Sequence, residues 1–147
     1  MTTIFLMAMM MAAPDTPTPQ AYDTVVVCPQ PYVEAMRPWF EYRTKQGHSI
    51  GVVTDTSSKK KIRETIRQAA EKGELKQVLL VGDVIADGSQ EVGVPVHYQK
   101  AVVNVLFGSE PEIPTDNYYA DLDDDNIPDV AIGRFSVSNE EELKGIV

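Results

Sequence analysis

Apolar residues along the chain form short continuous runs separated by longer amphipathic stretches. The first run, at residues 22–28, contains three consecutive valines, and similar runs occupy residues 49–54 and 78–81. Runs of this length and composition are typical of strands that are buried on both faces of a parallel sheet. A further run at residues 130–133 predicts another buried strand.

The stretch between the first two runs has the pattern of a helix. Between residues 31 and 46 apolar side chains recur near helical spacing, and Gly47 supplies a stop signal. Pro38 lies inside this stretch. Because proline disrupts a helix interior but is tolerated in the first turn, we expect either a kink or a short turn at residues 31–37 before the main helix.

Two more helices follow from the pattern. Ile62 and Ile66 recur on one side of a charged segment, and Ser138 with Glu141 three residues later forms a capping box that predicts a helix from about Asn139. The alternation of strands and helices predicts a three-layer α/β fold of the Rossmann-like kind, with a parallel sheet. Because the sequence stops within the last predicted helix, we expect this fold to be incomplete.

The periodicity is weak between residues 84 and 114. Short strands are indicated at residues 94–98 and 102–107. The pattern leaves open whether these strands pair as a hairpin.

Composition and charge narrow the classes of function. The chain has 147 residues, of which 43% are hydrophobic, as is typical of one globular domain. Its 22 acidic and 13 basic residues give a net charge of −9, which disfavours nucleic acid and anionic lipid as partners and favours cations. The single cysteine, Cys28, excludes an internal disulfide, and the sequence has no cysteine–histidine cluster for zinc. A bound metal would therefore need oxygen ligands.

The amino-terminal residues have the features of a targeting segment. The apolar run at residues 4–13 is too short to span a bilayer but matches the core of a signal peptide, although no basic residue precedes it and the cleavage pattern is poor. Residues 14–20 alternate proline with polar residues, as in a linker. We therefore expect a signal-peptide-like segment and linker at residues 1–20, a globular unit at residues 21–147 and no stable membrane anchor.

The densest chemical feature is the sequence DLDDDNIPD at residues 121–129, which has five carboxylates in nine positions. Mutual repulsion of such a group is relieved by a hard cation such as Ca²⁺, which binds carboxylate and carbonyl oxygens. The loop is not an EF-hand, because Ile132 stands where a bidentate glutamate is required. A solvated acidic turn is the alternative. The predicted calcium ligands are Asp121, Asp123, Asp125, Ile127 and Asp129.

Other candidate sites have less support from the sequence. Cys28 could form a catalytic pair with His48 or His97, but it ends an apolar strand, where a buried and inert thiol is the more common outcome. Asp83 follows the third predicted strand, where α/β sheets bind ligands, but an aspartate that caps backbone amides in a turn is the favoured interpretation. The sequence contains no glycine-rich nucleotide motif, GxSxG or HExxH.

The stretch TDNYYADLDDDNIPDVAIGRFSV at residues 115–137 resembles the gingipain family of cysteine peptidases, peptidase family C25. In that family an aspartate-rich loop and a strand with the pattern "PD-hydrophobic-A-hydrophobic-GR" precede a helix that starts with acidic residues, here at 140–142. The likeness extends upstream through VLLVGD at residues 78–83 and covers residues 21–147.

This resemblance implies a caspase-like catalytic domain of two subdomains, of which the chain is the first. The His-Gly motif and the nucleophilic cysteine belong to the second subdomain, and this sequence contains neither motif. It therefore implies no catalytic residue here, inactivity of the chain alone, a C-terminal catalytic subdomain as partner, and a protein or peptide substrate for the full-length enzyme. It also implies a secreted or cell-envelope location. A stand-alone calcium-dependent binding module of the same fold is the alternative.

Overall fold

A computed structural model describes residues 21–102, 108 and 110–147. The predicted signal-peptide-like segment and linker at residues 1–20 lie outside the described residues. The elements, in chain order, are β1 (Thr24–Val27), η1 (Gln30–Tyr32), α1 (Arg37–Lys45), β2 (Ile50–Val53), α2 (Lys59–Ala70), β3 (Gln77–Val81), β4 (Val84–Ile85), β5 (Val94–Pro95), β6 (His97–Lys100), β7 (Glu112–Thr115), η3 (Asn117–Tyr119), β8 (Ala131–Phe135) and α3 (Glu140–Lys144).

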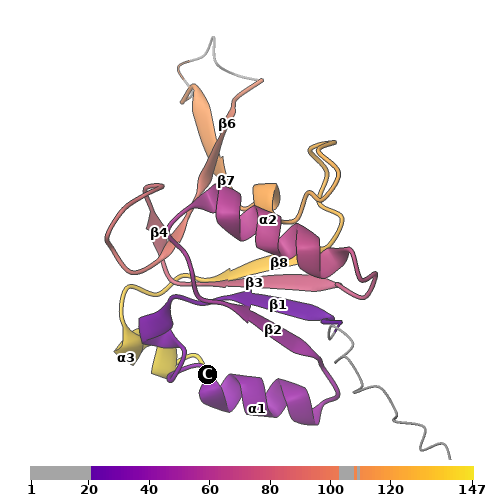
Figure 1. Cartoon of the computed structure of the whole chain (residues 1–147). Helices are drawn as coiled ribbons and strands as arrows, with labels where there is room; N and C mark the ends of the chain where they lie inside the picture. Colours follow the sequence, from indigo (N-terminus) through magenta and orange to yellow (C-terminus); the bar gives the residue numbers. More distant parts are fainter. Residues whose placement is uncertain (1–20, 103–107, 109) are drawn as a thin grey trace, which may run out of the picture.

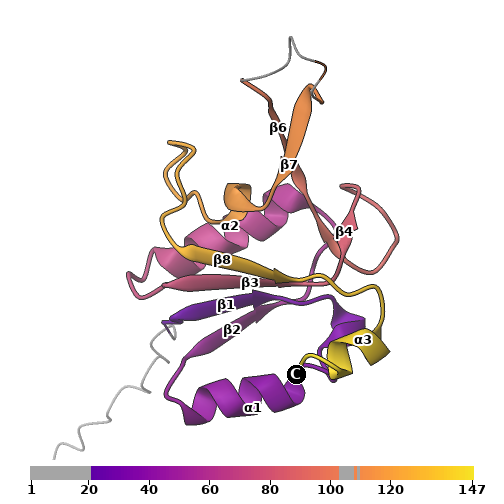
Figure 2. The same ribbon diagram turned by 180° about the vertical axis from the view of Figure 1, so that it is seen from behind.

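The centre of the molecule is a parallel sheet with the strand order β2-β1-β3-β8. Helix α2 lies on one side of this sheet, and α1 and α3 lie on the other, as Figures 1 and 2 show from opposite directions. The predicted three-layer α/β class is therefore confirmed. The four predicted buried strands are all present, and each of their ends lies within two residues of the predicted bound.

Alternating side chains of β1 supply both halves of the core. Val25 and Val27 pack in a cluster with Ile62 and Ile66 of α2. On the opposite face, Val26 packs in a second cluster that contains side chains from η1 and α3. Each aliphatic side chain that is fully buried in this way contributes about 1.5–3 kcal/mol relative to an exposed one. Because successive side chains of a strand point to opposite faces of the sheet, β1 packs against the helices on both sides.

The helices begin and end where backbone chemistry allows. The stretch around Pro38 divides into η1 and α1, with the proline in the first turn of α1, so the predicted short turn before the main helix is confirmed.

The predicted capping box of α3 is wrong by one residue. The side chain of Asn139, not that of Ser138, caps α3 by accepting a hydrogen bond from the backbone N–H of Glu142, 2.9 Å away. The helix ends at Lys144 and Gly145 is its C-cap, so it does not run to the last residue as expected.

The weakly periodic region forms two small pairs of strands. Strands β4 and β5 pair in parallel, whereas β6 and β7 form an antiparallel hairpin that projects from the body of the molecule. The hairpin pairs residues 97–100 with 112–115. Of the strand expected at 102–107, residues 103–107 lie outside the described residues.

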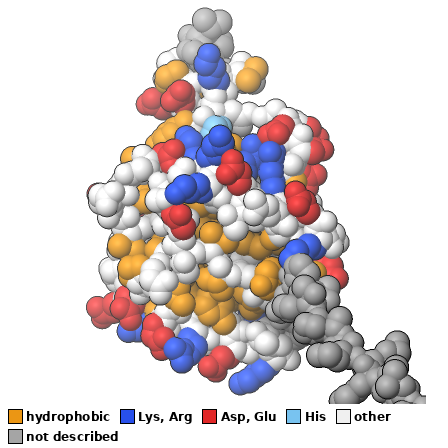
Figure 3. All heavy atoms as spheres, viewed as in Figure 1, with side chains coloured by type: hydrophobic (Ala, Val, Ile, Leu, Met, Phe, Trp, Pro, Cys, Tyr) orange, Lys and Arg blue, Asp and Glu red, His pale blue; other side chains and the backbone are white. Residues whose placement is uncertain are grey.

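Both edge strands of the sheet, β2 and β8, have a single partner among the described residues, and one face is partly uncovered near β8. Strand β8 pairs only with β3, and a groove of about 470 Å³ lies between α1 and the amino-terminal halves of β3 and β8. Its walls include Trp39, Leu79 and Phe135. In Figure 3 hydrophobic side chains also gather on the surface between the charged regions over α2 and α1. In the described part of the chain, no helix has the length and apolar character needed to cross a membrane.

Candidate metal centre

The acidic loop joins η3 to β8 and has a tightly folded backbone. Asp124 and Asn126 have positive φ angles of 70° and 67°, a region that aspartate and asparagine adopt more readily than other non-glycine residues. The N–H of Asp129 donates to the C=O of Ala120 at 2.9 Å and closes the loop. The residue types at the two positive-φ positions therefore suit the turn that they make.

Asp121 is the buried residue of this loop, with 6% of its surface exposed. Its Oδ1 accepts a hydrogen bond from the N–H of Asp124 at 2.7 Å, and its Oδ2 accepts one from the N–H of Asn126 at 3.3 Å. Nη2 of Arg63 lies 3.1 Å from the same Oδ2 and also donates to the C=O of Asp121 at 2.6 Å. A buried carboxylate with these partners is satisfied and anchors the loop to α2.

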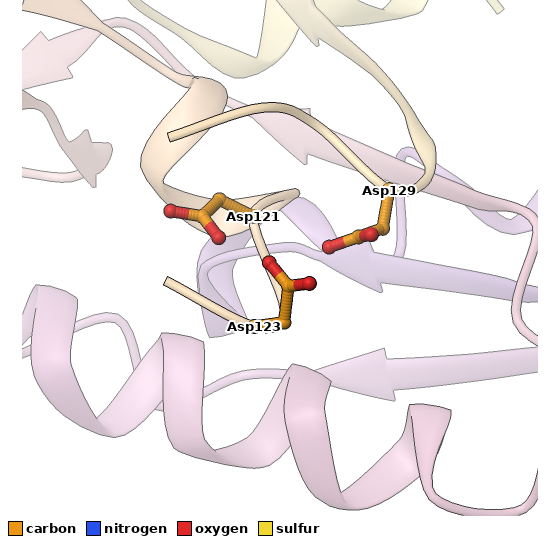
Figure 4. Close-up of side chains that lie close together, drawn as sticks. All are labelled: Asp121, Asp123 and Asp129. Atoms are coloured by element: carbon orange, nitrogen blue, oxygen red, sulfur yellow. The ribbon is translucent and has the colours of Figure 1, made fainter. Parts of the chain in front are cut away.

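Asp121, Asp123 and Asp129 form a carboxylate cluster: one oxygen from each lies within 4.8 Å of the others. One oxygen of each faces the space between the three side chains (Figure 4). Oδ1 of Asp123 accepts a hydrogen bond from the N–H of Asp125 at 3.2 Å, and Oδ2 of Asp129 accepts one from the N–H of Leu122 at 2.7 Å. Three carboxylates with oxygens so close suit a hard divalent cation.

The structure does not bring all five predicted ligands together. Asp125 is not part of the carboxylate cluster. Its Oδ1 instead accepts a hydrogen bond from the N–H of Ile127 at 2.7 Å. The Ile127 residue is 65% exposed. The hydrogen bond between Asp125 and Ile127 stabilises the local turn, and the carbonyl of Ile127 stays a predicted ligand.

Two arginines of α2 lie against the loop and were not identified from the sequence. Oδ1 of Asp124 is 2.8 Å from Nη1 of Arg63 and 2.8 Å from Nη2 of Arg67. The hydrogen bond from Arg67, together with the charges of both guanidinium groups, lowers the pKa of Asp124. The same contact raises the pKa of Arg67. The sequence feature that could have identified the two arginines is their i, i+4 spacing, which places both on one face of a helix.

The other candidate residues, Cys28, His48 and His97, each have a different partner. The thiol of Cys28 is buried and donates to the C=O of Pro29 at 3.7 Å. Nδ1 of His48 lies 3.0 Å from a carboxylate oxygen of Asp23, and the ring of His97 stacks on Tyr118. The structure therefore does not form the thiol–imidazole pair.

Asp83 lies at the carboxyl end of β3, in the turn that precedes β4. Its Oδ1 accepts a hydrogen bond from the N–H of Val84 at 2.7 Å. Its backbone N–H donates to the C=O of Val137 at 2.8 Å. These contacts fit the interpretation of Asp83 as a turn residue.

Comparison with known proteins connects this fold to a family. The model of the family described as "Peptidase family C25" matches residues 17–147. The chain belongs to peptidase family C25. The family predicted from the aspartate-rich stretch is thereby confirmed, and this C25 chain is a peptidase-related domain.

A solved structure described as "Structure of Protease" is similar to this C25 chain, with a TM-score of 0.63 and 24% sequence identity. The likeness covers 84% of this chain and 26% of that chain, so the C25 chain spans about a quarter of that protease chain. At this level of identity the likeness supports the fold alone. No curated protein matches the sequence.

Proposed function

We propose that this chain is the N-terminal, non-catalytic part of a secreted cysteine endopeptidase of family C25, and that it supports a catalytic part lying outside it. The family match over residues 17–147 supports the connection to proteolysis. The main support for the non-catalytic role is the burial and the raised pKa of Cys28, the one cysteine in the sequence.

Cys28 is unsuited to nucleophilic catalysis. Its residue has no exposed surface, and burial raises the pKa of the thiol to about 12. Because the thiolate is the reactive form, a cysteine nucleophile needs a lowered pKa and an accessible position. The nucleophile of the proposed endopeptidase would therefore come from another part of the protein.

The supporting role is favoured by the open side of the sheet. Parallel sheets are covered on both faces, and an exposed edge strand offers unpaired backbone groups. The small residues Ala131 and Gly133 of β8 line the groove and leave space in it. A Cβ built on Gly133 would have no atom within 4 Å. A C-terminal catalytic subdomain would gain both backbone pairing and apolar contact by covering this surface.

Peptidase assays test this proposal. In a protein that contains this chain and the remainder of the peptidase, Cys28→Ala should retain the peptidase activity, because its thiol takes no part in catalysis. The 147-residue chain alone should cleave no protein substrate. The proposed role would be contradicted if the folded Cys28→Ala variant lost its activity. It would also be contradicted if the chain alone had peptidase activity that this substitution abolished.

We further propose that the carboxylate cluster binds a structural Ca²⁺ ion. The support is the close approach of three carboxylates, of which Asp121 is buried. Arg63 already neutralises part of the charge on Asp121, so the ion would compete with this guanidinium group. The alternative function, a stand-alone calcium-dependent binding module, predicts that calcium controls partner binding and not peptidase activity.

A further inference from the structure

The hairpin formed by β6 and β7 is joined to the body of the molecule at His97. This residue begins β6 and pairs with Thr115, the last residue of β7. Beyond this pair the hairpin projects away from the sheet and α2 (Figure 1). The contacts of His97 are therefore at the base of the hairpin, where they can fix its direction.

Aromatic stacking holds the His97 ring in place. The imidazole lies nearly parallel to the ring of Tyr118 in η3, with 4.3 Å between centroids and an interplanar angle of 16°. The guanidinium carbon of Arg63 in α2 lies 4.4 Å from the centroid of the same Tyr118 ring. The hairpin, η3 and α2 thus meet at one aromatic ring.

The position of His97 suits a neutral imidazole. Its Nδ1 is shielded from solvent and has no hydrogen-bond partner among the described residues. A neutral ring can place a lone pair at this atom, whereas a protonated ring must place an N–H there. A buried N–H without an acceptor is destabilising, because it has given up its hydrogen bond to water without gaining another.

The surrounding charges oppose protonation as well. Burial is the largest influence that lowers the pKa of His97, followed by the positive charges of Lys59 and Arg63. Both cations belong to α2, Tyr118 is the titratable group that faces the ring from η3, and the residue paired with His97 on β7 is Thr115, which does not titrate. Protonation would add a third positive charge at this junction.

We propose that His97 is a pH-sensitive latch: its neutral ring holds the base of the hairpin against η3 and α2, and its protonated ring releases it. When the ring leaves the stack, both N–H groups reach water and the added charge moves away from Lys59 and Arg63. Without its contact with the body, the two-stranded β6–β7 pairing is only marginally stable, so its backbone hydrogen bonds open more often.

The expected pH range follows from the direction of this shift. A histidine in water titrates near pH 6.5, and the docked ring titrates below that value. The released state therefore binds more protons as the pH falls below about 6.5, and docking weakens. Between pH 7 and pH 5 the released population should rise by up to about 25-fold, the limit for a group that is protonated only after release.

Hydrogen exchange of the folded 147-residue chain tests the latch. Protection factors of the backbone amides at 97–100, 112, 113 and 115 should fall between pH 7 and pH 5, while those of β1 and β3 stay nearly constant. In His97→Phe, which keeps an aromatic ring but cannot be protonated, this pH dependence should disappear. The matched control His48→Gln removes the other histidine of the sequence and should leave it unchanged.

Hairpin protection that does not depend on pH in the unmodified chain would overturn the proposal, and so would an equal pH dependence in His97→Phe. NMR titration of the His97 ring in the unmodified chain gives a second measurement that needs no variant. The ring signal should report a pKa below 6.5 and change together with the hairpin amides. A ring that titrates at or above 6.5 would contradict the latch.

Discussion

Arg134 of β8 donates two parallel hydrogen bonds to Asp116, from Nε to Oδ2 at 2.8 Å and from Nη2 to Oδ1 at 2.6 Å. The third nitrogen, Nη1, donates to the backbone carbonyls of Gly82 at 3.0 Å and Val94 at 3.1 Å. The Arg134 side chain is only 7% exposed. One guanidinium group therefore connects the end of β3, the start of β5 and the segment before η3.

Replacing Arg134 by lysine should destabilise the protein by about 2–3 kcal/mol, because an ammonium group cannot make the paired bonds and leaves buried carbonyls without donors. Urea unfolding followed by circular dichroism would measure the loss. Arg37→Lys is the matched control, since Arg37 pairs with Glu34 on the surface and exposed pairs contribute less than about 1 kcal/mol. Equal stabilities of the two variants would contradict the role of Arg134.

Gly82 should not tolerate a side chain. Its φ is +114°, and an added Cβ would lie 3.0 Å from the Cα of Gly93, a backbone atom that cannot move aside by itself. Gly82→Ala should cost about 1–3 kcal/mol from backbone strain, with the steric contact in addition. Gly133→Ala is the control, because its Cβ would meet no atom within 4 Å and its cost should be small. A thermal melt of each variant would separate the two cases.

Calcium should raise the melting temperature relative to a chelator. At a calcium concentration 100 times the Kd, binding to the folded state alone adds about 2.7 kcal/mol. Asp123→Asn and Asp129→Asn should each reduce this gain. Asp125→Asn should retain it, because Asp125 lies in the same loop but outside the carboxylate cluster. An unchanged melting temperature with calcium would contradict the metal site, and loss in Asp125→Asn alone would contradict the three-carboxylate set.

The thiol of Cys28 should react slowly with iodoacetamide while the protein is folded. With a pKa of about 12 its thiolate fraction at pH 8 is at least about a thousandfold below that of an unfolded cysteine, whose pKa is near 8.5. Mass spectrometry of native and urea-unfolded samples over time would measure both rates. Rapid labelling of the folded chain would mean that the thiol is accessible after all.

The sequence was sufficient for the parts of the fold that depend on burial. The run of valines in β1 predicted a central strand, and Ile62 and Ile66 predicted the buried face of α2. Strand β7 was missed because its pattern of exposure gives no hydrophobic signal: Glu112, Ile113 and Pro114 are all exposed. Periodicity detects strands that bury a face, and this hairpin buries little of its length.

The carboxylate cluster was only partly predictable for a different reason. The ligands were predicted from the spacing of a calcium loop, but Asp125 lies outside the cluster, and its Oδ1 accepts a hydrogen bond from the N–H of Ile127. Arg63, which binds Asp121, comes from a distant part of the sequence. Local spacing carries no information about such a partner.

The pairing of β8 with β3 also has a consequence for how the chain folds. Strands β1, β2 and β3 follow one another with single helical crossovers, whereas β8 reaches β3 only after the segment that contains the hairpin and the acidic loop. Closing this longer loop costs more entropy before any contact compensates for it. We therefore expect the three earlier strands to assemble first and β8 to join last, so the acidic loop and the Arg134 contacts would form in the final step of folding.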